Sequence, residues 1–409
     1  VFVRVGSELR GSDLAGATLI RLTQEDFILP GLFDLHAHYA VDLYGEGRVD
    51  DDQAYPTLFL ANGVTSTYPA GEIDPVKMQA LRVRIENGEQ VGPRLFNSGP
   101  YFGTARQGWD QEITAGEIRS EVDHWYAEGV RNFKAKGIRP GHLQALIDAA
   151  HSHGATVTAH LDSGYRNSVN PRDAIAMGLD RVEHFLGGDA LTPDRSAYAS
   201  LVEMTPDMPE FGRIAQLYID NGVYFDATLS AYGYYGERDP EVYTYFEPEM
   251  DYLTPEARAA VESRLPREVN QQFERIYWVK RELIKAFYDM GGGDLITLGT
   301  DHPSWGEYFT PFSIHRELHT MVLAGLPPAA ALRTATINAA RALQVEDRLG
   351  TVEPGKLADL VIVTGNPLSD IRNTRHLHTV IRAGTIYDSR KLMDSVKGKL
   401  DVARAGGPD

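Results

Sequence analysis

Two patterns of hydrophobic and polar positions alternate along most of the chain. From residue 30 onward, short apolar runs bounded by turn residues are separated by stretches with helical spacing of apolar residues. "GHLQALIDAAHSHG" (141–154), for example, has that spacing and ends at a glycine, as helices often do. The pattern predicts eight strands separated by helical material, at 31–38, 63–70, 93–99, 130–137, 155–161, 179–186, 222–230 and 295–302.

An eightfold β/α alternation of this length favours a closed (β/α)8 TIM-like barrel over residues 31–349, with a doubly wound open sheet as the alternative. The flanks 1–30 and 350–395 are rich in β-type residues and turns. Because the two ends share this composition, we expect a small β-sandwich domain built from both chain termini. The segment 232–280 is long, acidic and rich in tyrosine, and we interpret it as a helical lid over the barrel mouth.

Composition narrows the class of protein. Of 409 residues 43% are hydrophobic and 24% charged, and no apolar run approaches the roughly 18 residues of a membrane span. We therefore expect a soluble globular protein. A net charge of −17 argues against nucleic acid as a partner. The chain has no cysteine, so a metal would be held mainly by His, Asp or Glu. It begins at Val1 inside a predicted strand, so we expect it to be trimmed, and the compartment, cytoplasmic or exported, stays open.

Chemistry-bearing residues gather at the predicted strand ends. His36 and His38, two positions apart, point to the same face of their strand. In a barrel, the carboxyl ends of the strands carry the active site. One His-x-His pair is weak support for a metal, and a lone histidine is more often structural. The joint set favours a metal centre: His36, His38, Lys134, His160, His184 and Asp301.

Several motifs in chain order carry a family resemblance. "PGLFDLHAH", "VTAHL", "VEHF" and "LGTDH", followed by "TATINAARALQVEDRLGTVEPGKLADLVIV", resemble the amidohydrolase superfamily. The details are most similar to the prolidase and imidazolonepropionase-related branch. The resemblance runs over nearly the whole chain and is weakest in 100–125 and 232–290.

The resemblance implies a site for two divalent metal ions, for which zinc suits the ligands. His36 and His38 would bind the more buried metal, and His160 and His184 the more exposed one. Asp301 would ligate the buried metal and accept a proton.

Lys134, in "NFKAK" (132–136), matches the family's strand-four lysine, which is carboxylated and bridges the two metals. An ordinary lysine is protonated and cannot be a ligand, whereas its carboxylated form is an anion with two oxygens. Lys136 shares the face and is the alternative, but the register favours Lys134.

The implied activity is that of a binuclear metal-dependent hydrolase that acts on carbon–nitrogen bonds. A metal-bridging hydroxide would attack an amide carbonyl of a peptide-like or N-acyl amino acid substrate. Asp301 would act as general base and then as acid. "DATLSAY" (226–232) is similar to a strand-seven pattern whose tyrosine donates to the substrate carbonyl, here Tyr232. Packing of a lid tyrosine is the alternative.

Other functions stay open. A hydrolase of lactones or cyclic amides would use the same site. A mononuclear deaminase would need a Glu shortly after the strand-five histidine, where this chain offers Asp162. Prolidase-like relatives carry Gly-Gly-His-Gly after strand three, whereas this chain has "GPYFGTARQGWD" (99–110), which puts a dipeptide substrate in doubt. A barrel kept only as an interaction scaffold would have lost ligands.

The remaining expectations concern partners and discounted motifs. We expect a small-molecule substrate, with an apolar or aromatic group if the loop aromatics face inward, and a homo-oligomer. These aromatics are Tyr39, Tyr44, Tyr101, Trp109, Tyr232, Tyr234, Tyr235, Trp305 and Tyr308. We interpret "HSHG" (151–154) as a solvated helix end, "HRELH" (315–319) as a plain helix face and "VDDD" (49–52) as a solvated acidic loop. Nothing in the sequence places Arg106 or Arg139 against a substrate carboxylate.

Overall fold

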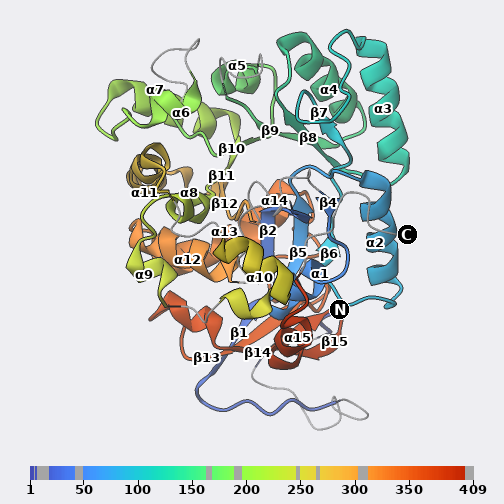
Figure 1. Cartoon of the computed structure of the whole chain (residues 1–409), viewed down its shortest axis with the longest axis vertical. Helices are drawn as coiled ribbons and strands as arrows, with labels where there is room; N and C mark the ends of the chain where they lie inside the picture. The colour runs from blue at the N-terminus through green and yellow to red at the C-terminus, as the bar shows by residue number, and fades with distance from the viewer. Residues whose placement is uncertain are drawn as a thin grey trace.

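The computed structural model describes residues 1–3, 5–6, 18–41, 49–162, 168–187, 196–245, 249–263, 268–302 and 312–400. Within them, two parallel sheets and one antiparallel sheet form the frame of the molecule (Figure 1). No helix among these residues is both long and apolar enough to cross a membrane.

Strands occur in all eight predicted places. With the further strand β7 they form two sheets, three strands in the order β2-β5-β6 and six in the order β12-β11-β10-β9-β8-β7, with parallel pairing throughout. Their bounds are β2 (Leu32–Ala37), β5 (Val64–Pro69), β6 (Arg94–Leu95), β7 (Tyr101–Phe102), β8 (Asn132–Lys136), β9 (Thr156–His160), β10 (Arg181–Glu183), β11 (Tyr224–Asp226) and β12 (Ile296–Thr297). A two-stranded ladder, β3 (Ala40–Val41) with β4 (Val49–Asp50), follows β2.

The predicted third strand, 93–99, contains β6, and a further strand, β7, follows it at Tyr101–Phe102. Strand β6 pairs with β5, whereas β7 pairs with β8 in the other sheet. Gly99, at φ 65°, and Pro100 lie between them. A left-handed residue turns the chain out of the strand, and a proline has no N–H for the ladder, so the pairing changes partner there.

Backbone hydrogen bonds connect the edges of the two parallel sheets. Leu35 N donates to Leu298 O at 2.9 Å, and Asp301 N donates to His36 O at 2.8 Å. On the other side, Glu72 and Pro100 form a parallel bridge. The arrangement is a TIM-barrel-like α/β fold, and it brings β2 directly beside the segment that follows β12.

Helices follow most strands and cover the outer faces (Figure 1). Phe133 of β8 and Val157 of β9 share a hydrophobic cluster with Leu146 and Ile147 of α4. The helices are α1 (Tyr55–Ala61), α2 (Pro75–Glu86), α3 (Ala115–Ala127), α4 (Pro140–Ser152), α5 (Pro171–Ala176), α6 (Ala197–Leu201), α7 (Pro209–Asn221), α8 (Leu229–Tyr235), α9 (Pro240–Tyr243), α10 (Pro255–Glu262), α11 (Gln271–Asp289), α12 (Ser313–Leu323), α13 (Pro328–Thr334), α14 (Ile337–Ala342) and α15 (Ser389–Val396).

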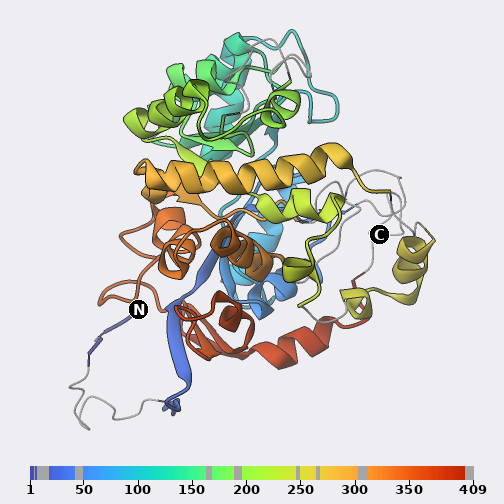
Figure 2. The same cartoon turned by 90° about the vertical axis from the view of Figure 1, so that its left-hand side faces the viewer.

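The described part of 232–280 is largely helical, and α11 runs across the middle of the molecule in Figure 2. Helix α11 packs on α8, which contains Tyr232. The role of this segment as a lid stays a prediction.

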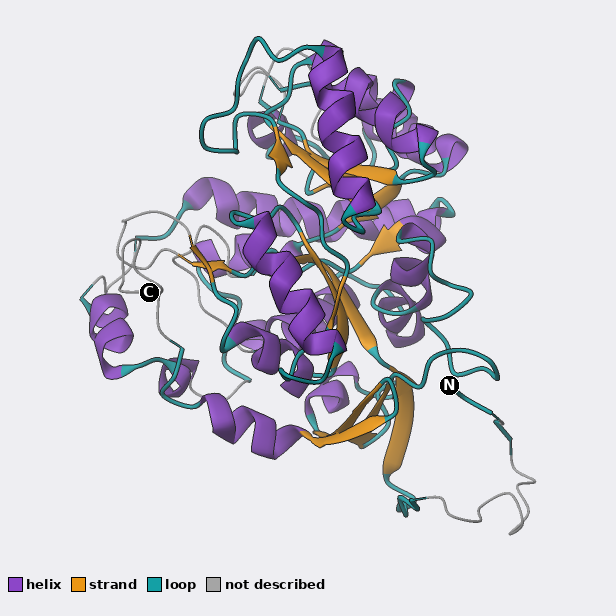
Figure 3. Ribbon diagram, turned by 90° about the vertical axis from the view of Figure 1, so that its right-hand side faces the viewer, coloured by secondary structure: helices purple, strands orange, loops and turns teal. Residues whose placement is uncertain are grey.

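A four-stranded antiparallel sheet, whose strands lie at the bottom of Figure 3, joins residues from early and late in the chain (blue and red in Figure 1). Its order is β1-β13-β14-β15, and Phe27 pairs with Val363. The bounds are β1 (Asp26–Pro30), β13 (Leu360–Thr364), β14 (Leu377–Arg382) and β15 (Thr385–Asp388). Residues 7–17 of the expected sandwich lie outside the described residues, and the division into domains stays a prediction.

Candidate metal centre

Strand β2 carries the His-x-His pair. Phe33 and Leu35 pack in a hydrophobic cluster with Ala339 of α14, so the alternating residues His36 and His38 face the other side of the strand. Both imidazoles are buried, and their ring centroids are 5.2 Å apart. The structure thus brings the pair together on the inner face.

Asp34 fixes β2 against the segment that carries Asp301. It accepts hydrogen bonds from His36 N (3.1 Å), Thr300 N (3.0 Å) and Thr300 Oγ1 (2.6 Å). Burial raises the pKa of Asp34 to about 6. Next to it, a Cβ on Gly299 would lie 2.4 Å from the Cβ of His36. The glycine of "LGTDH" is therefore required for this close approach.

Asp301 lies between the two histidines of β2. Its Oδ1 is 2.9 Å from His38 Nε2 and 3.4 Å from His36 Nε2. Burial opposes ionisation of this carboxyl, but the hydrogen bond with His38 and the neighbouring charges outweigh it and lower its pKa below the usual range. Asp301 is therefore an ionised carboxylate at neutral pH.

His160 and His184 complete the cluster. Their ring centroids are 4.6 Å apart, and His184 is 4.7 Å from His36. His184 Nδ1 is hydrogen-bonded to Thr228 Oγ1 at 2.7 Å, which orients the ring. Burial lowers the pKa of His36 and of His184 well below 6.5, so both imidazoles stay neutral and keep a lone pair for a metal.

Lys134 is fully buried and forms an ion pair with Glu183. In the strand register it lies opposite Thr158, whereas Lys136 lies opposite His160, one layer nearer the strand ends. Burial lowers the pKa of the Lys134 amine, although Glu183 opposes this shift. Burial lowers the pKa of His36, and the positive charge of Lys134 lowers it further. Carboxylation of Lys134 stays a prediction.

Two buried carboxylates of this cluster were not anticipated from the sequence. Glu183 directly precedes His184 in the sequence. Asp226 is paired with Glu183 in the β10–β11 register. Strand alternation would turn Glu183 away from His184, but His184 has φ 66°, a left-handed conformation that ends the alternation. Arg181 Nε lies 3.3 Å from Asp226 Oδ2 beneath the site.

Tyr232, the predicted oxyanion donor, lies beside His184. Its ring is buried, with its centroid 6.1 Å from that of His184 and 4.1 Å from Lys280 Nζ. Burial, followed by the nearby Tyr198, raises its pKa well above 10, so the phenol stays protonated and can donate.

The donor set fits a divalent metal. Three groups each bring ligand atoms within 4.8 Å of one another: His36, His184 and Asp301; His160, Glu183 and His184; and His36, Glu183 and Asp226. His36 Nδ1 is buried and has no hydrogen-bond partner among the described residues. Neutral imidazoles with carboxylates are ligands that zinc and related cations prefer. The site residues are thus suited to hold such ions.

Two discounted motifs have roles that differ from the expectation. The acidic run at 49–52 is buried rather than solvated: Asp50 accepts from Ile73 N and Asp74 N, and Asp52 pairs with Arg84 at 2.6 Å. The sequence shows the charges but not these partners. "HRELH" lies on a buried part of α12 rather than a plain face, and Glu317 accepts from the backbone N–H groups that begin α8.

Several of the other residues singled out in the sequence have partners outside the centre. "HSHG" lies at the end of α4, where His151 and His153 pair with Asp180 and Asp123. Asp162 caps the start of α6 by accepting from Ala197 N at 2.6 Å. Arg106 pairs with Glu121 at 2.5 Å, and Arg139 donates to Gln111 O at 3.0 Å. Tyr44, Trp305 and Tyr308 lie outside the described residues.

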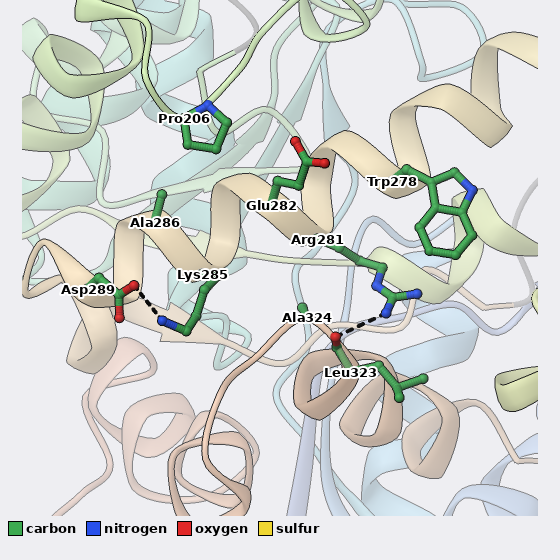
Figure 4. Close-up of a pocket in the computed structure, with 9 residues that line it drawn as sticks. All are labelled: Pro206, Trp278, Arg281, Glu282, Lys285, Ala286, Asp289, Leu323 and Ala324. Atoms are coloured by element: carbon green, nitrogen blue, oxygen red, sulfur yellow. Dashed lines mark hydrogen bonds and ion pairs between the residues drawn. The ribbon is translucent and has the colours of Figure 1, made fainter.

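A surface pocket of about 490 Å³ lies apart from this centre (Figure 4). It is lined by one side of α11 and by Pro206, Leu323 and Ala324. Within it Lys285 pairs with Asp289, and Arg281 donates to Leu323 O. None of the predicted ligands lines it. The pocket therefore says nothing about the chemistry of the centre.

Comparisons with known proteins agree with the motifs. The profile of the amidohydrolase family matches residues 27–387. Adenine deaminase 4 of Rhizobium meliloti (strain 1021) is 40% identical over 62 residues, which cover 15% of this chain and 9% of that protein. Imidazolonepropionase of Symbiobacterium thermophilum is 46% identical over 74 residues, 18% of this chain and 17% of that protein. Each match thus spans less than a fifth of the relative.

Among solved structures, the fold is similar to that of a Xaa-Pro dipeptidase with methionine bound in its active site. The two chains are 23% identical, the TM-score is 0.64, and the alignment covers 91% of each chain. This likeness concerns the fold.

Proposed function

Since this chain belongs to the amidohydrolase family, we propose that it is a metal-dependent hydrolase that cleaves an amide carbon–nitrogen bond. One observation carries the proposal: four histidines and Asp301, from strands far apart in the sequence, converge on one inner face with their imidazoles within ring contact. We also infer that the two parallel sheets close into one barrel, since backbone hydrogen bonds connect both pairs of edges.

In this proposal the centre holds two divalent ions, preferably zinc. His36, His38 and Asp301 would hold the more buried ion, His160 and His184 would hold the more exposed one, and carboxylated Lys134 would supply an anionic ligand. When bound, such ions lower the pKa of a water molecule and polarise a carbonyl oxygen.

Asp301 is the proton carrier of the proposed reaction. Its lowered pKa makes it a carboxylate at neutral pH, able to take a proton from the nucleophile and return it to the leaving nitrogen. Its Oδ1 lies 2.9 Å from His38 Nε2, so both residues are placed to reach one ion. Tyr232, a protonated phenol beside His184, is proposed to donate to the carbonyl oxygen as negative charge develops there.

The surroundings of His160 favour a substrate with an aromatic or apolar group. Tyr198 has its ring centroid 6.4 Å from His160, 4.8 Å from Phe185 and 6.2 Å from Tyr232. Phe273 of α11 continues this wall, 5.2 Å from Tyr232. Such a surface prefers a flat or apolar group next to the scissile bond. Peptide-like and N-acyl amino acid amides with an aromatic side chain are the first substrates to test.

Two alternatives use parts of the same centre. A lactone or cyclic amide would be opened by the same attack on a carbonyl. A mononuclear deaminase needs an acid after the strand-five histidine, and Asp162 is instead engaged at the start of α6. The expected homo-oligomer stays a prediction.

The test is metal content per chain, measured by elemental analysis on protein purified without chelator and supplied with bicarbonate. We expect close to two equivalents, and hydrolysis of N-acyl aromatic amino acids that a chelator abolishes. One equivalent with activity on ring amines would favour the deaminase. No bound metal after addition of zinc or manganese would contradict the proposal.

A further inference from the structure

Glu183 occupies a central position in the cluster. It is fully buried and is paired with Asp226 in the β10–β11 register, and it follows directly after the last pair of the β9–β10 register, Val182 with Ala159. Its Oε1 lies 3.6 Å from His36 Nδ1. Glu183 belongs to two of the three ligand groups described above, one with His160 and His184 and one with His36 and Asp226. Its carboxylate therefore reaches both halves of the proposed two-metal centre.

An independent observation on His36 points to a ligand at this place. The imidazole is 2% exposed, and its Nδ1 has no hydrogen-bond partner among the described residues, although it faces the carboxylates of Glu183 and Asp226. A buried nitrogen left in this way costs free energy unless something binds it. A cation between this nitrogen and the Glu183 carboxylate would satisfy both groups.

The charge balance gives a second reason. The cationic partner of Glu183 is the amine of Lys134, and Glu183 Oε1 also accepts a hydrogen bond from Thr158 Oγ1 at 3.3 Å. Carboxylation of that amine exchanges the positive charge for a negative one: the ammonium first loses a proton, and the neutral nitrogen then forms a bond to carbon dioxide and loses a second proton. Two buried anions in contact repel each other strongly unless a cation lies between them. Glu183 must then find a new positive partner, and the metals are next to it.

We propose that Glu183 is a direct metal ligand, placed between the two metal positions and additional to the six residues of the His, Lys and Asp set. The inference rests on the proposed function. It makes the centre richer in carboxylate than those six residues, and thus more favourable to harder cations such as manganese.

The experiment compares zinc affinity, by competition with a chelator, in four proteins: wild type, Glu183→Gln, Lys134→Ala and the double variant. If Glu183 is a ligand, Glu183→Gln weakens zinc binding at least about tenfold both with Lys134 present and in the Lys134→Ala background. If Glu183 only balances the charge of Lys134, the double variant binds zinc as well as Lys134→Ala does, which overturns the proposal.

Two provisions keep the comparison decisive. The Lys134→Ala proteins are measured with and without propionate, which can enter the space left by the lysine. If the Lys134→Ala proteins bind zinc too weakly to be compared, Glu183→Gln with Lys134 present is loaded with cadmium and its ¹¹³Cd resonances are recorded. Resonances unchanged from wild type overturn the proposal, and shifts of both support it.

Glu72→Gln is the matched control. Glu72 is another buried glutamate, hydrogen-bonded to Asn97 Nδ2 at 2.6 Å and belonging to none of the ligand groups. We expect it to keep wild-type zinc affinity. A wild-type protein that binds no metal would refute the proposed function itself, whereas two equivalents in both wild type and Glu183→Gln, with equal affinity, would refute only the role of Glu183.

Discussion

At the scale of single residues, the centre depends on backbone conformations that side chains disfavour. His184, Thr228 and Asp301 have φ of 66°, 46° and 55°. Each such residue costs about 1–3 kcal/mol and persists only where its surroundings require it. His184 follows β10 directly, and Thr228 and Asp301 lie within a few residues of the ends of β11 and β12. The backbone strain is thus concentrated just after the ends of the strands, where the site residues lie.

Thr228 allows a test of this arrangement. In Thr228→Gly the backbone conformation is retained at lower strain, but the hydrogen bonds to His184 Nδ1 and from Lys280 Nζ are lost. We expect zinc affinity to fall about 10–100-fold, measured by chelator competition. Gln344→Gly, at φ 58° after α14 and away from the centre, should leave affinity unchanged. Equal zinc affinity in Thr228→Gly and wild type would refute the orienting role.

Asp301 is the second residue to test. Asp301→Asn removes the negative charge between His36 and His38 and the proton acceptor. We expect a folded protein that binds less metal and hydrolyses substrate at least about 100-fold more slowly. Circular dichroism, elemental analysis and steady-state kinetics are the measurements. Wild-type turnover in this variant would remove Asp301 from the mechanism.

The sequence was informative for residues whose role follows from their type and place. Histidines at strand ends were found because alternation and barrel topology place them together. Glu183 was missed because the same alternation turns it outward, and the left-handed His184 that reverses this leaves no mark in the sequence. Asp50 was misjudged because its partners are backbone N–H groups some 20 residues later.

At the scale of elements, the start of α8 is held by two helices from elsewhere in the chain. Glu317 of α12 accepts from Leu229 N and Ser230 N, both at 2.7 Å. Lys280 of α11 donates to Thr228 Oγ1 at 3.2 Å and lies over the ring of Tyr232. Burial lowers the pKa of Lys280 and raises that of Glu317, and their mutual attraction opposes both shifts. These two buried side chains thus position Tyr232, Glu317 through the start of α8 and Lys280 through the face of the ring.

Removal of one partner should be costly. We expect Lys280→Met to lower the free energy of unfolding by about 3–5 kcal/mol, since it leaves the Glu317 carboxyl buried without its cation. Lys280→Met/Glu317→Gln should recover part of this loss. Urea denaturation measures both. Lys285→Met replaces a partly exposed lysine of the same helix, which pairs with Asp289, and should change stability by less than about 0.5 kcal/mol. Additive effects of the Lys280 and Glu317 substitutions would show that the two side chains do not interact.

Elements were predicted well where periodicity is strong. The strand and helix alternation follows from the spacing of apolar residues. Strand β7 was missed, because the predicted third strand ended at Gly99 and the pairing of residues 101–102 with β8 has no local signal in the sequence. The contact of α11 and α12 with α8 is set by tertiary packing and has no local signal.

At the scale of the whole molecule, His315 couples α12 to the C-terminal region. Its Nδ1 is 3.1 Å from Thr374 Oγ1, in the 3-10 helix Ile371–Arg375 that precedes β14. Burial, followed by the charges of Arg375 and His376, lowers its pKa well below 6.5. Below pH 6.5 the unfolded chain therefore binds a proton at this residue that the folded protein does not. Stability is lost as the pH falls.

For the metal-free protein we expect the free energy of unfolding to fall between pH 6.5 and 5, with His315 contributing about 1.4 kcal/mol per pH unit. His315→Gln should reduce the slope by that amount, measured by urea denaturation at several pH values. An unchanged slope would mean that His315 is protonated in the folded state too.

The pairing of β1 with β13 has a consequence for how the chain is made. Pro30 lies opposite Leu360, so more than three-quarters of the polypeptide must be synthesised between the two partners. At about 5–20 residues per second, that interval is on the order of tens of seconds. During this time the apolar side of residues 26–30 has no sheet to join, and loop closure over such a separation is slow. The nascent chain thus exposes a strand edge for as long as the barrel takes to emerge, which makes this short segment a natural place for a chaperone to act.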